Sequence, residues 1–251
     1  MLSHIPDAAS LAFILLGALV AGFTTGFAGF GTGLVASGLW FHALPAPLVP
    51  PLVALAAVAA QLAGLVTVRR SFEWGRAAPY LVGGALGVPI GVAALSRANP
   101  DTLRLSVGVF LAGYAGFQLL GFAKRGIGNW GGRAADGSVG ITGGFLGGFA
   151  GLSGALPLVW LQMRGGPSAS QRATYQPFNL IVLGMASLGM ALSGALDAQV
   201  LTIAALCLPL TLAGAFLGAR VYTGVSEAAF RRIVLALLLG SGAILIAQGV
   251  G

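Results

Sequence analysis

The sequence predicts an all-α polytopic membrane protein built from two homologous halves. Three observations predict this class: high hydropathy, few charges and a Gly-rich phrase that occurs twice. The mean hydropathy is +0.93, and 57% of the 251 residues are hydrophobic whereas only 8% are charged. Soluble domains carry about 25% charged residues. The apolar stretches recur at lengths near the roughly 20 residues that cross a bilayer.

The Gly-rich phrase appears once in each half of the chain. Residues 22–29 read GFTTGFAG and residues 144–151 read GFLGGFAG, identical at six of eight positions and 122 residues apart. Paired Gly-interrupted apolar segments are typical of transporters whose helices break at the binding site. We therefore predict an N-terminal transmembrane repeat over 1–122, a basic cytoplasmic linker over 123–137 and a C-terminal transmembrane repeat over 138–251.

Each half contains one long apolar segment followed by three of ordinary spanning length. In chain order the segments cover residues 11–42, 48–68, 79–97, 102–122, 138–163, 173–193, 198–221 and 227–249. N-cap-like residues, Asn99 and Ser226, precede the last segment of each half. The halves also align at glycines beyond the phrase: Gly87 with Gly214, and Gly113 with Gly240.

The first segment has about 32 residues, too many for one simple span and too few for two. Its centre, AGFGTG over 28–33, is a poor helix former. The segment is therefore either one broken helix or a re-entrant hairpin that returns to the side from which it entered.

Loop charges favour hairpins in both halves, and hence an inverted repeat. With hairpins, the basic loops near 69–76, 123–137, 164–172 and 220–232 all fall on one side, and the exception is Arg97, with Arg104 near the same end. With ordinary spans, the same loops are divided between the two sides. The positive-inside rule makes the basic side cytoplasmic.

The two breaks supply a candidate anion site. A new half-helix is expected to begin near Thr32 or Ser153, and its first N–H groups lack internal partners and carry partial positive charge. Two such ends near the bilayer midplane bind an anion without a buried formal charge. The predicted substrate-binding residues of the breaks are Gly31, Thr32, Gly33, Gly151, Ser153 and Gly154. The competing interpretation is that the glycines only allow close helix packing.

A second polar stretch, QRATYQPFN over 171–179, opens the sixth apolar segment. Polar residues inside a membrane are costly and often functional. Gln176 and Asn179 are three residues apart and share a helix face, so both are predicted to line the site, with Gln61 from the first half. The alternative for these amides is hydrogen bonding between helices. Arg172 either draws anions from the cytoplasm or anchors a helix end.

Other residue types argue against several function classes. Every Asp and Glu lies near a segment end or in a loop, which disfavours a carboxylate proton relay or a tight cation site. His4, His42 and Cys207 offer neither a metal centre nor a disulfide. We expect no enzyme activity, no metal, no cofactor and no nucleic-acid partner, since the cations behind the +7 net charge lie mostly in short loops. No basic n-region precedes residues 11–42, so we assign this segment to the mature protein.

The doubled phrase, its continuation FGTGL over 30–34 and the stretch 171–179 resemble the TauE/SafE family of membrane transporters, the sulfite-exporter-like permeases. The resemblance covers essentially the whole chain. It implies transport of small sulfur-containing anions or carboxylates, such as sulfite or sulfoacetate, across a bacterial cytoplasmic (inner) membrane. Many family members have a longer Gly run where this chain has residues 29–33 and 151–154, a departure that bears on selectivity.

The sequence thus predicts a multi-pass anion transporter that works by alternating access. Its expected partners are a small anionic substrate (sulfite, a sulfonate or a carboxylate) and the lipid bilayer. The oligomeric state, monomer or homodimer, stays open, as do the transport direction and the coupling ion. The rival interpretations are an anion channel and an accessory membrane protein whose glycines serve packing alone.

Overall fold

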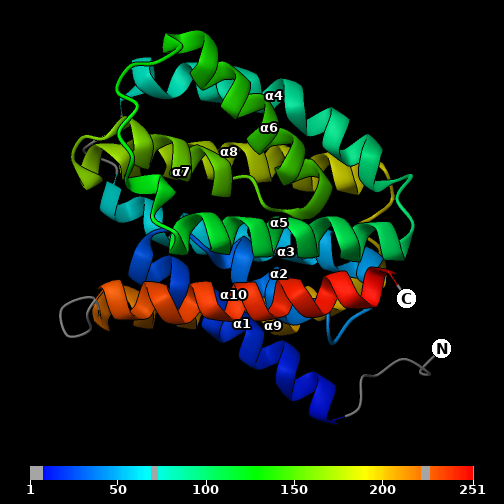
Figure 1. Cartoon of the computed structure of the whole chain (residues 1–251). Coiled ribbons are helices and arrows are strands. Elements are labelled where there is room, and N and C mark those ends of the chain that lie inside the picture. Colours follow the sequence, from blue (N-terminus) through cyan, green and yellow to red (C-terminus); the bar gives the residue numbers. More distant parts are fainter. Residues whose placement is uncertain (1–7, 69–72, 222–226, 251) are drawn as a thin grey trace.

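The computed structural model describes residues 8–68, 73–221 and 227–250. These residues form ten α-helices and contain no β-strand (Figure 1). The helices are α1 (Ala8–Ala28), α2 (Thr32–Trp40), α3 (Val49–Val68), α4 (Trp74–Leu95), α5 (Pro100–Leu119), α6 (Gly132–Ala150), α7 (Ala155–Arg164), α8 (Ser168–Leu192), α9 (Ala198–Val221) and α10 (Glu227–Val250). Six of them, α1, α3, α4, α8, α9 and α10, are long and apolar enough to cross a membrane. The chain is therefore an all-α multi-pass membrane protein, as predicted.

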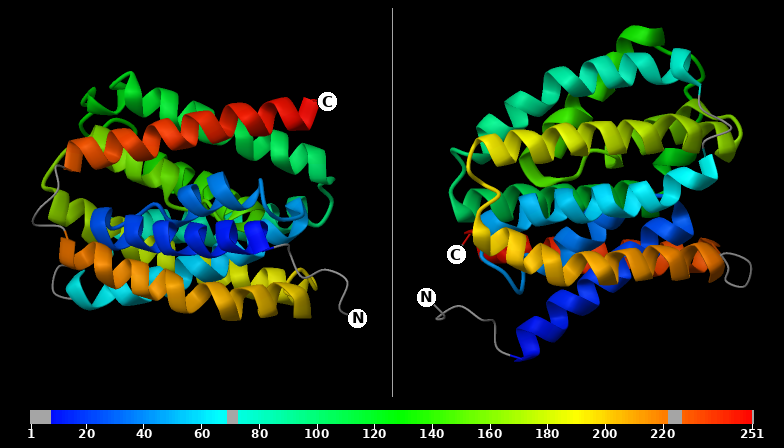
Figure 2. Two further views of the ribbon diagram at one scale, coloured as in Figure 1. Left: turned by 90° about the horizontal axis from the view of Figure 1, so that it is seen from below. Right: turned by 180° about the vertical axis from the view of Figure 1, so that it is seen from behind.

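Both long apolar segments are interrupted between two helices. Residues 29–31 separate α1 from α2, and residues 151–154 separate α6 from α7. Glycine is required at these turns because Gly29, Gly31 and Gly151 have φ angles of 80°, 110° and 73°, which other residues rarely adopt. After its break, α2 turns back and finishes at the end of the molecule where α1 begins (Figures 1 and 2).

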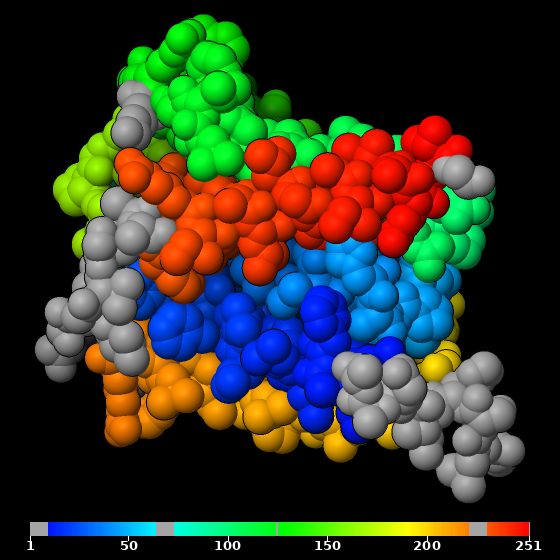
Figure 3. Space-filling model, turned by 60° about the horizontal axis from the view of Figure 1, so that its bottom comes forward, coloured from blue at the N-terminus to red at the C-terminus, as the bar shows by residue number. Residues whose placement is uncertain are grey.

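The two halves of the chain are interleaved. α1 packs along α9 and α6 along α4, while α5 pairs with α10 and α3 with α8. In the space-filling view, α1 lies between α9 and α10 on one face of the molecule (Figure 3). Each of these helix pairs joins the first half to the second, so the main interfaces lie between the halves.

Glycines of the repeated phrase bring the interleaved helices close together. A Cβ atom on these glycines would lie 1.9–2.4 Å from a carbonyl oxygen of the facing helix: Gly22 faces Thr211, Gly26 faces Ala215, Gly144 faces Gly84 and Gly148 faces Val88. The contacts between α1 and α9 therefore recur at equivalent positions between α6 and α4. The phrase has two roles, since these four glycines serve packing whereas Gly29 and Gly151 form the breaks.

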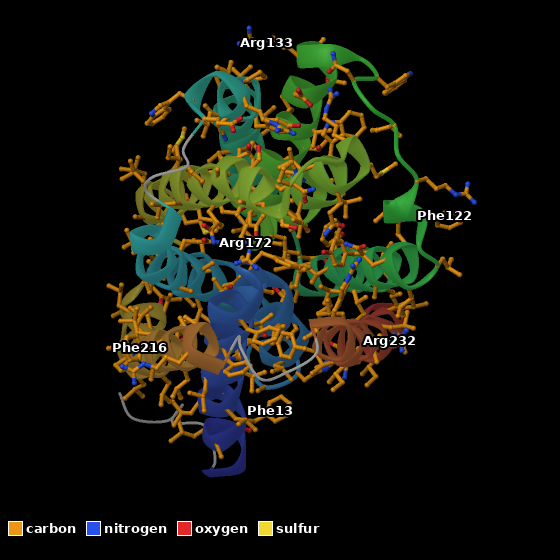
Figure 4. The ribbon with its side chains drawn as sticks, turned by 90° about the vertical axis from the view of Figure 1, so that its left-hand side faces the viewer. Phe13, Phe122, Arg133, Arg172, Phe216 and Arg232 are labelled. Atoms are coloured by element: carbon orange, nitrogen blue, oxygen red, sulfur yellow. The ribbon has the colours of Figure 1, made fainter. Side chains whose placement is uncertain are left out.

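The connections between helices gather at two opposite ends of the molecule. The α4–α5 and α8–α9 connections lie at the end where α1 begins and α10 finishes, here the terminal end (Figures 1 and 2). The α5–α6 and α7–α8 connections lie at the other end, here the linker end. An end-on view of the linker end shows Arg172 near the middle of the bundle and Arg133 and Arg232 toward its edge (Figure 4).

Candidate functional site

The two breaks meet inside the bundle. A Cβ atom on Gly33 would lie 2.6 Å from the carbonyl oxygen of Gly151, so the start of α2 touches the end of α6. Around this contact lies a cavity of about 30 Å³, here the central cavity, which α3 and α8 complete. Eight of the ten predicted site residues line it: Gly31, Thr32, Gly33, Gln61, Gly151, Ser153, Gly154 and Asn179.

The half-helix α2 begins at Thr32, the position expected from the sequence. The Thr32 N–H donates to the hydroxyl oxygen of Thr25 (2.9 Å), and the Thr32 hydroxyl bonds the Ala21 carbonyl oxygen (3.2 Å). The first bond within α2 runs from the Val35 N–H to the Gly31 carbonyl oxygen (2.9 Å). The N–H groups of Gly33 and Leu34 come before that bond, so they carry the partial positive charge of a helix N-terminus.

The half-helix α7 begins at Ala155, directly after the second break, and its N-cap is Gly154. The Ser153 hydroxyl donates to Asn179 Oδ1 on α8 (3.0 Å). A Cβ atom on Gly154 would lie 2.4 Å from the Asn179 amide, so only glycine leaves room for that side chain. Thr32 and Ser153 were predicted to offer hydroxyl donors to a ligand, but both hydroxyls bond protein groups in this structure.

The central cavity is polar and uncharged. Among the described residues that line it, none carries a formal charge. Gln61 is 5% exposed, and its Oε1 has no hydrogen-bond partner in the described part of the chain. A buried polar atom without a partner costs about 1–3 kcal/mol. The cavity therefore combines two helix N-termini with the buried amide side chains of Gln61 and Asn179.

The other two predicted residues, Gln176 and Arg172, lie beside the first break and do not line the central cavity. Gln176 Nε2 donates to the Gly29 carbonyl oxygen (3.3 Å), and the Tyr175 hydroxyl donates to the Ala28 carbonyl oxygen (3.3 Å). Arg172 Cζ lies 3.5 Å from the position of a Cβ on Gly29. Tyr175 and Gln176 of α8 thus bond the carbonyl oxygens at the C-terminal end of α1 and at the first residue of the break, where donors and cations are favourable.

A buried ion pair at the linker end was not anticipated from the sequence. Arg164 Nε donates to Asp136 Oδ1 at 2.7 Å, and the two side chains are only 7% and 13% exposed. Tyr80 (2.6 Å) and Trp160 (2.8 Å) donate to the same carboxylate oxygen. Arg164 also donates to linker carbonyl oxygens, including that of Gly132 (2.7 Å). The pair ties α4, α6 and α7 to the linker.

The described residues contain no group of three His, Cys, Asp or Glu side chains arranged to hold a metal ion. Cys207 is buried as a free thiol in α9. His42, just beyond α2, shares a hydrogen bond of 2.9 Å with the Ser241 hydroxyl. Partial burial lowers the pKa of His42 below its usual value of 6.5.

A family model described as "Sulfite exporter TauE/SafE" matches residues 14–245, which is nearly the whole chain. No curated protein and no solved structure matches the chain significantly.

Proposed function

Because the chain belongs to the TauE/SafE sulfite exporter family, we propose that it carries small sulfur-containing anions across the bacterial cytoplasmic membrane. The substrate is an oxyanion such as sulfite or an organosulfonate, held in the central cavity. The N–H groups at the starts of α2 and α7 bind it, together with the amides of Asn179 and Gln61. Thr32 and Ser153 hold the two half-helices in position.

The observation that carries this proposal is the convergence of two helix N-termini, one from each half, in one uncharged cavity. Helix N-termini bind anions through N–H groups and partial positive charge. Repeat-built transporters point half-helix N-termini at the anionic groups of their substrates in the same way.

Two observations support an inverted repeat with re-entrant hairpins. The contacts of α1 with α9 recur between α6 and α4, as two halves related by a pseudo-twofold axis require. The α1–α2 pair starts and finishes at the terminal end, whereas α6 starts and α7 finishes at the linker end (Figures 1 and 2). The arginine-rich linker end is then cytoplasmic by the positive-inside rule. Cysteine-accessibility labelling at Ala43 and Ala135 tests this topology, which puts them on opposite membrane faces.

Alternating access is part of this proposal. The contact between Gly33 and Gly151 lies where the two breaks meet, beside the central cavity. Rocking of the hairpins against the remaining helices opens the cavity to one side at a time, as in other repeat-built transporters.

Anion flux into proteoliposomes tests the proposal through Asn179→Asp. This substitution keeps the shape of the side chain and adds a negative charge to the cavity, so we expect the flux of sulfite and of sulfoacetate to fall at least tenfold. Asn129→Asp is the matched control, since Asn129 lies in the linker and bonds Arg164 (2.9 Å). Unchanged anion flux in folded Asn179→Asp protein would refute the site. Flux that does not saturate with substrate would identify a channel.

A further inference from the structure

We infer that a second cavity, beside Arg231, binds the anionic head of a small organic anion. This cavity, here the Arg231 cavity, has a volume of about 70 Å³ and lies between α1, α2, α5, α7 and α10. Its place on the transport path rests on the proposed function, but the binding itself does not.

Gln118 organises the polar end of the Arg231 cavity. Its Oε1 accepts a short hydrogen bond from Arg231 Nη2. Its Nε2 donates to the hydroxyl oxygen of Tyr114 (3.2 Å) and to Oε1 of Gln162 (3.2 Å). Gln118 is 5% exposed, so the amide is held in a fixed position within the bundle.

This arrangement leaves hydrogen-bond donors facing the cavity. Tyr114 and Gln162 use their oxygens to accept from Gln118, so the Tyr114 O–H and the Gln162 Nε2 remain as donors. Arg231 retains further N–H groups. A guanidinium flanked by two neutral donors is a site for an oxyanion, with charge-assisted hydrogen bonds.

The rest of the Arg231 cavity is apolar. Phe30, Leu34, Phe230, Leu235 and Leu238 form its walls. Sulfite, which is charged and fully hydrated, gains nothing from such walls. An organic anion buries its hydrocarbon part there, at about 25 cal/mol per Å² of apolar surface removed from water. The cavity therefore selects a sulfonate or carboxylate with a short apolar tail.

The Arg231 cavity adjoins the central cavity. Phe30, Gly31 and Leu34 line both cavities, so the wall between them is a single stretch of chain at the first break. Arg231 lies near the start of α10, toward the linker end. An anion from that side meets Arg231 first and reaches the half-helix N-termini by passing Phe30. The Arg231 cavity is then an access station that admits organic anions to the transport site.

Calorimetric titration of the purified protein in phosphatidylcholine nanodiscs tests this inference, with propane-1-sulfonate and sulfite as probes. Arg231→Gln is expected to raise the dissociation constant for propane-1-sulfonate at least tenfold and to leave sulfite binding unchanged. Arg232→Gln is the matched control, because Arg232 is the exposed neighbour at the edge of the bundle (Figure 4) and should leave both unchanged. Arg231→Lys retains the charge but loses the planar fork, so an intermediate value is expected.

Three results would overturn the inference. One is equal propane-1-sulfonate affinity in folded Arg231→Gln and Arg232→Gln, with folding checked by the ligand-free melting temperature. Another is equal dependence of sulfite binding on Arg231. The third is loss of sulfonate binding when phosphatidylglycerol is added to the nanodiscs, which would assign the cavity to a lipid head group. Failure of the proposed function is distinct: Asn179→Asp would then retain transport, whatever Arg231→Gln does to binding.

Discussion

Glycines at equivalent positions of the two halves allow a matched test of helix packing. Gly87 on α4 and Gly214 on α9 face a neighbouring helix, and a Cβ atom on them would lie 2.0 and 2.1 Å from a backbone carbonyl oxygen. Gly113 and Gly240, also aligned between the halves, have no atom within 4 Å of the same position. Alanine at each of the four sites adds the same methyl group to two different environments.

The size of the effect follows from these distances. Ordinary contact begins near 3.4 Å, so Gly87→Ala or Gly214→Ala forces two backbones apart by more than 1 Å. Because the facing atoms belong to the backbone and no side chain can rotate away, the loss of stability lies at the upper end of the range for overpacking, about 3 kcal/mol. Alanine recovers roughly 1 kcal/mol through its helix propensity. We therefore expect a net loss of about 2 kcal/mol at Gly87 or Gly214, and a gain of up to about 1 kcal/mol at Gly113 or Gly240.

Thermal unfolding of the purified single variants in one detergent measures the difference. At about 2–4 °C per kcal/mol for a chain of this size, Gly87→Ala and Gly214→Ala should melt about 4–8 °C below the wild type. Gly113→Ala and Gly240→Ala should melt at or slightly above it. The reasoning is refuted if all four variants melt together. A drop at Gly87 alone would show that the two interfaces are not equivalent.

Three further predictions concern single side chains. Asp136→Asn leaves Arg164 buried without its counter-charge, so the free energy of unfolding should fall by about 3–5 kcal/mol. In the same melting assay, the exposed control Asp101→Asn should change the free energy of unfolding by less than about 0.5 kcal/mol. Equal effects of the two substitutions would contradict this account. The lowered pKa of His42 means that the unfolded state binds more protons than the folded state below about pH 6.5, so stability should fall as the pH is lowered through that value. His42→Gln should therefore flatten the dependence of the melting temperature on pH. An unchanged slope would exclude His42 as the source of that dependence. Thr25→Val removes the acceptor for the Thr32 N–H at the start of α2 and should cost about 0.5–2 kcal/mol, as loss of a helix cap does; a wild-type melting temperature would show that Thr25 does not act as a cap.

Much of the fold was predictable because it depends on local sequence. Hydropathy located all eight apolar segments, and the clustered glycines marked both interruptions, since glycine at positive φ is a local requirement. The start of α2 at Thr32 followed from the same break. The helix α6 begins at Gly132, before the apolar run at 138–163. Its first turns are polar and are held by the ion pair between Asp136 and Arg164, which hydropathy does not register.

What the sequence left open depends on contacts between distant segments. The packing role of Gly22 and Gly144 becomes visible only with the facing helix in position. Gln176 shares a helix face with Asn179, yet only Asn179 lines the central cavity, because Gln176 bonds the end of α1. Gln118 and Gln162 lie 44 residues apart on different helices. Their burial inside apolar segments was a usable signal, but the sequence gives no sign that they meet Arg231.

The interleaving of the halves has a consequence for biogenesis. Because α1 packs along α9 and α4 along α6, neither interface can close while only the first half has left the ribosome. The early helices must wait in the membrane with their glycine faces against lipid until α6 and α9 are inserted. Two half-length chains would form the same interfaces by pairing with each other, so the single gene product has the architecture of a dimer joined end to end.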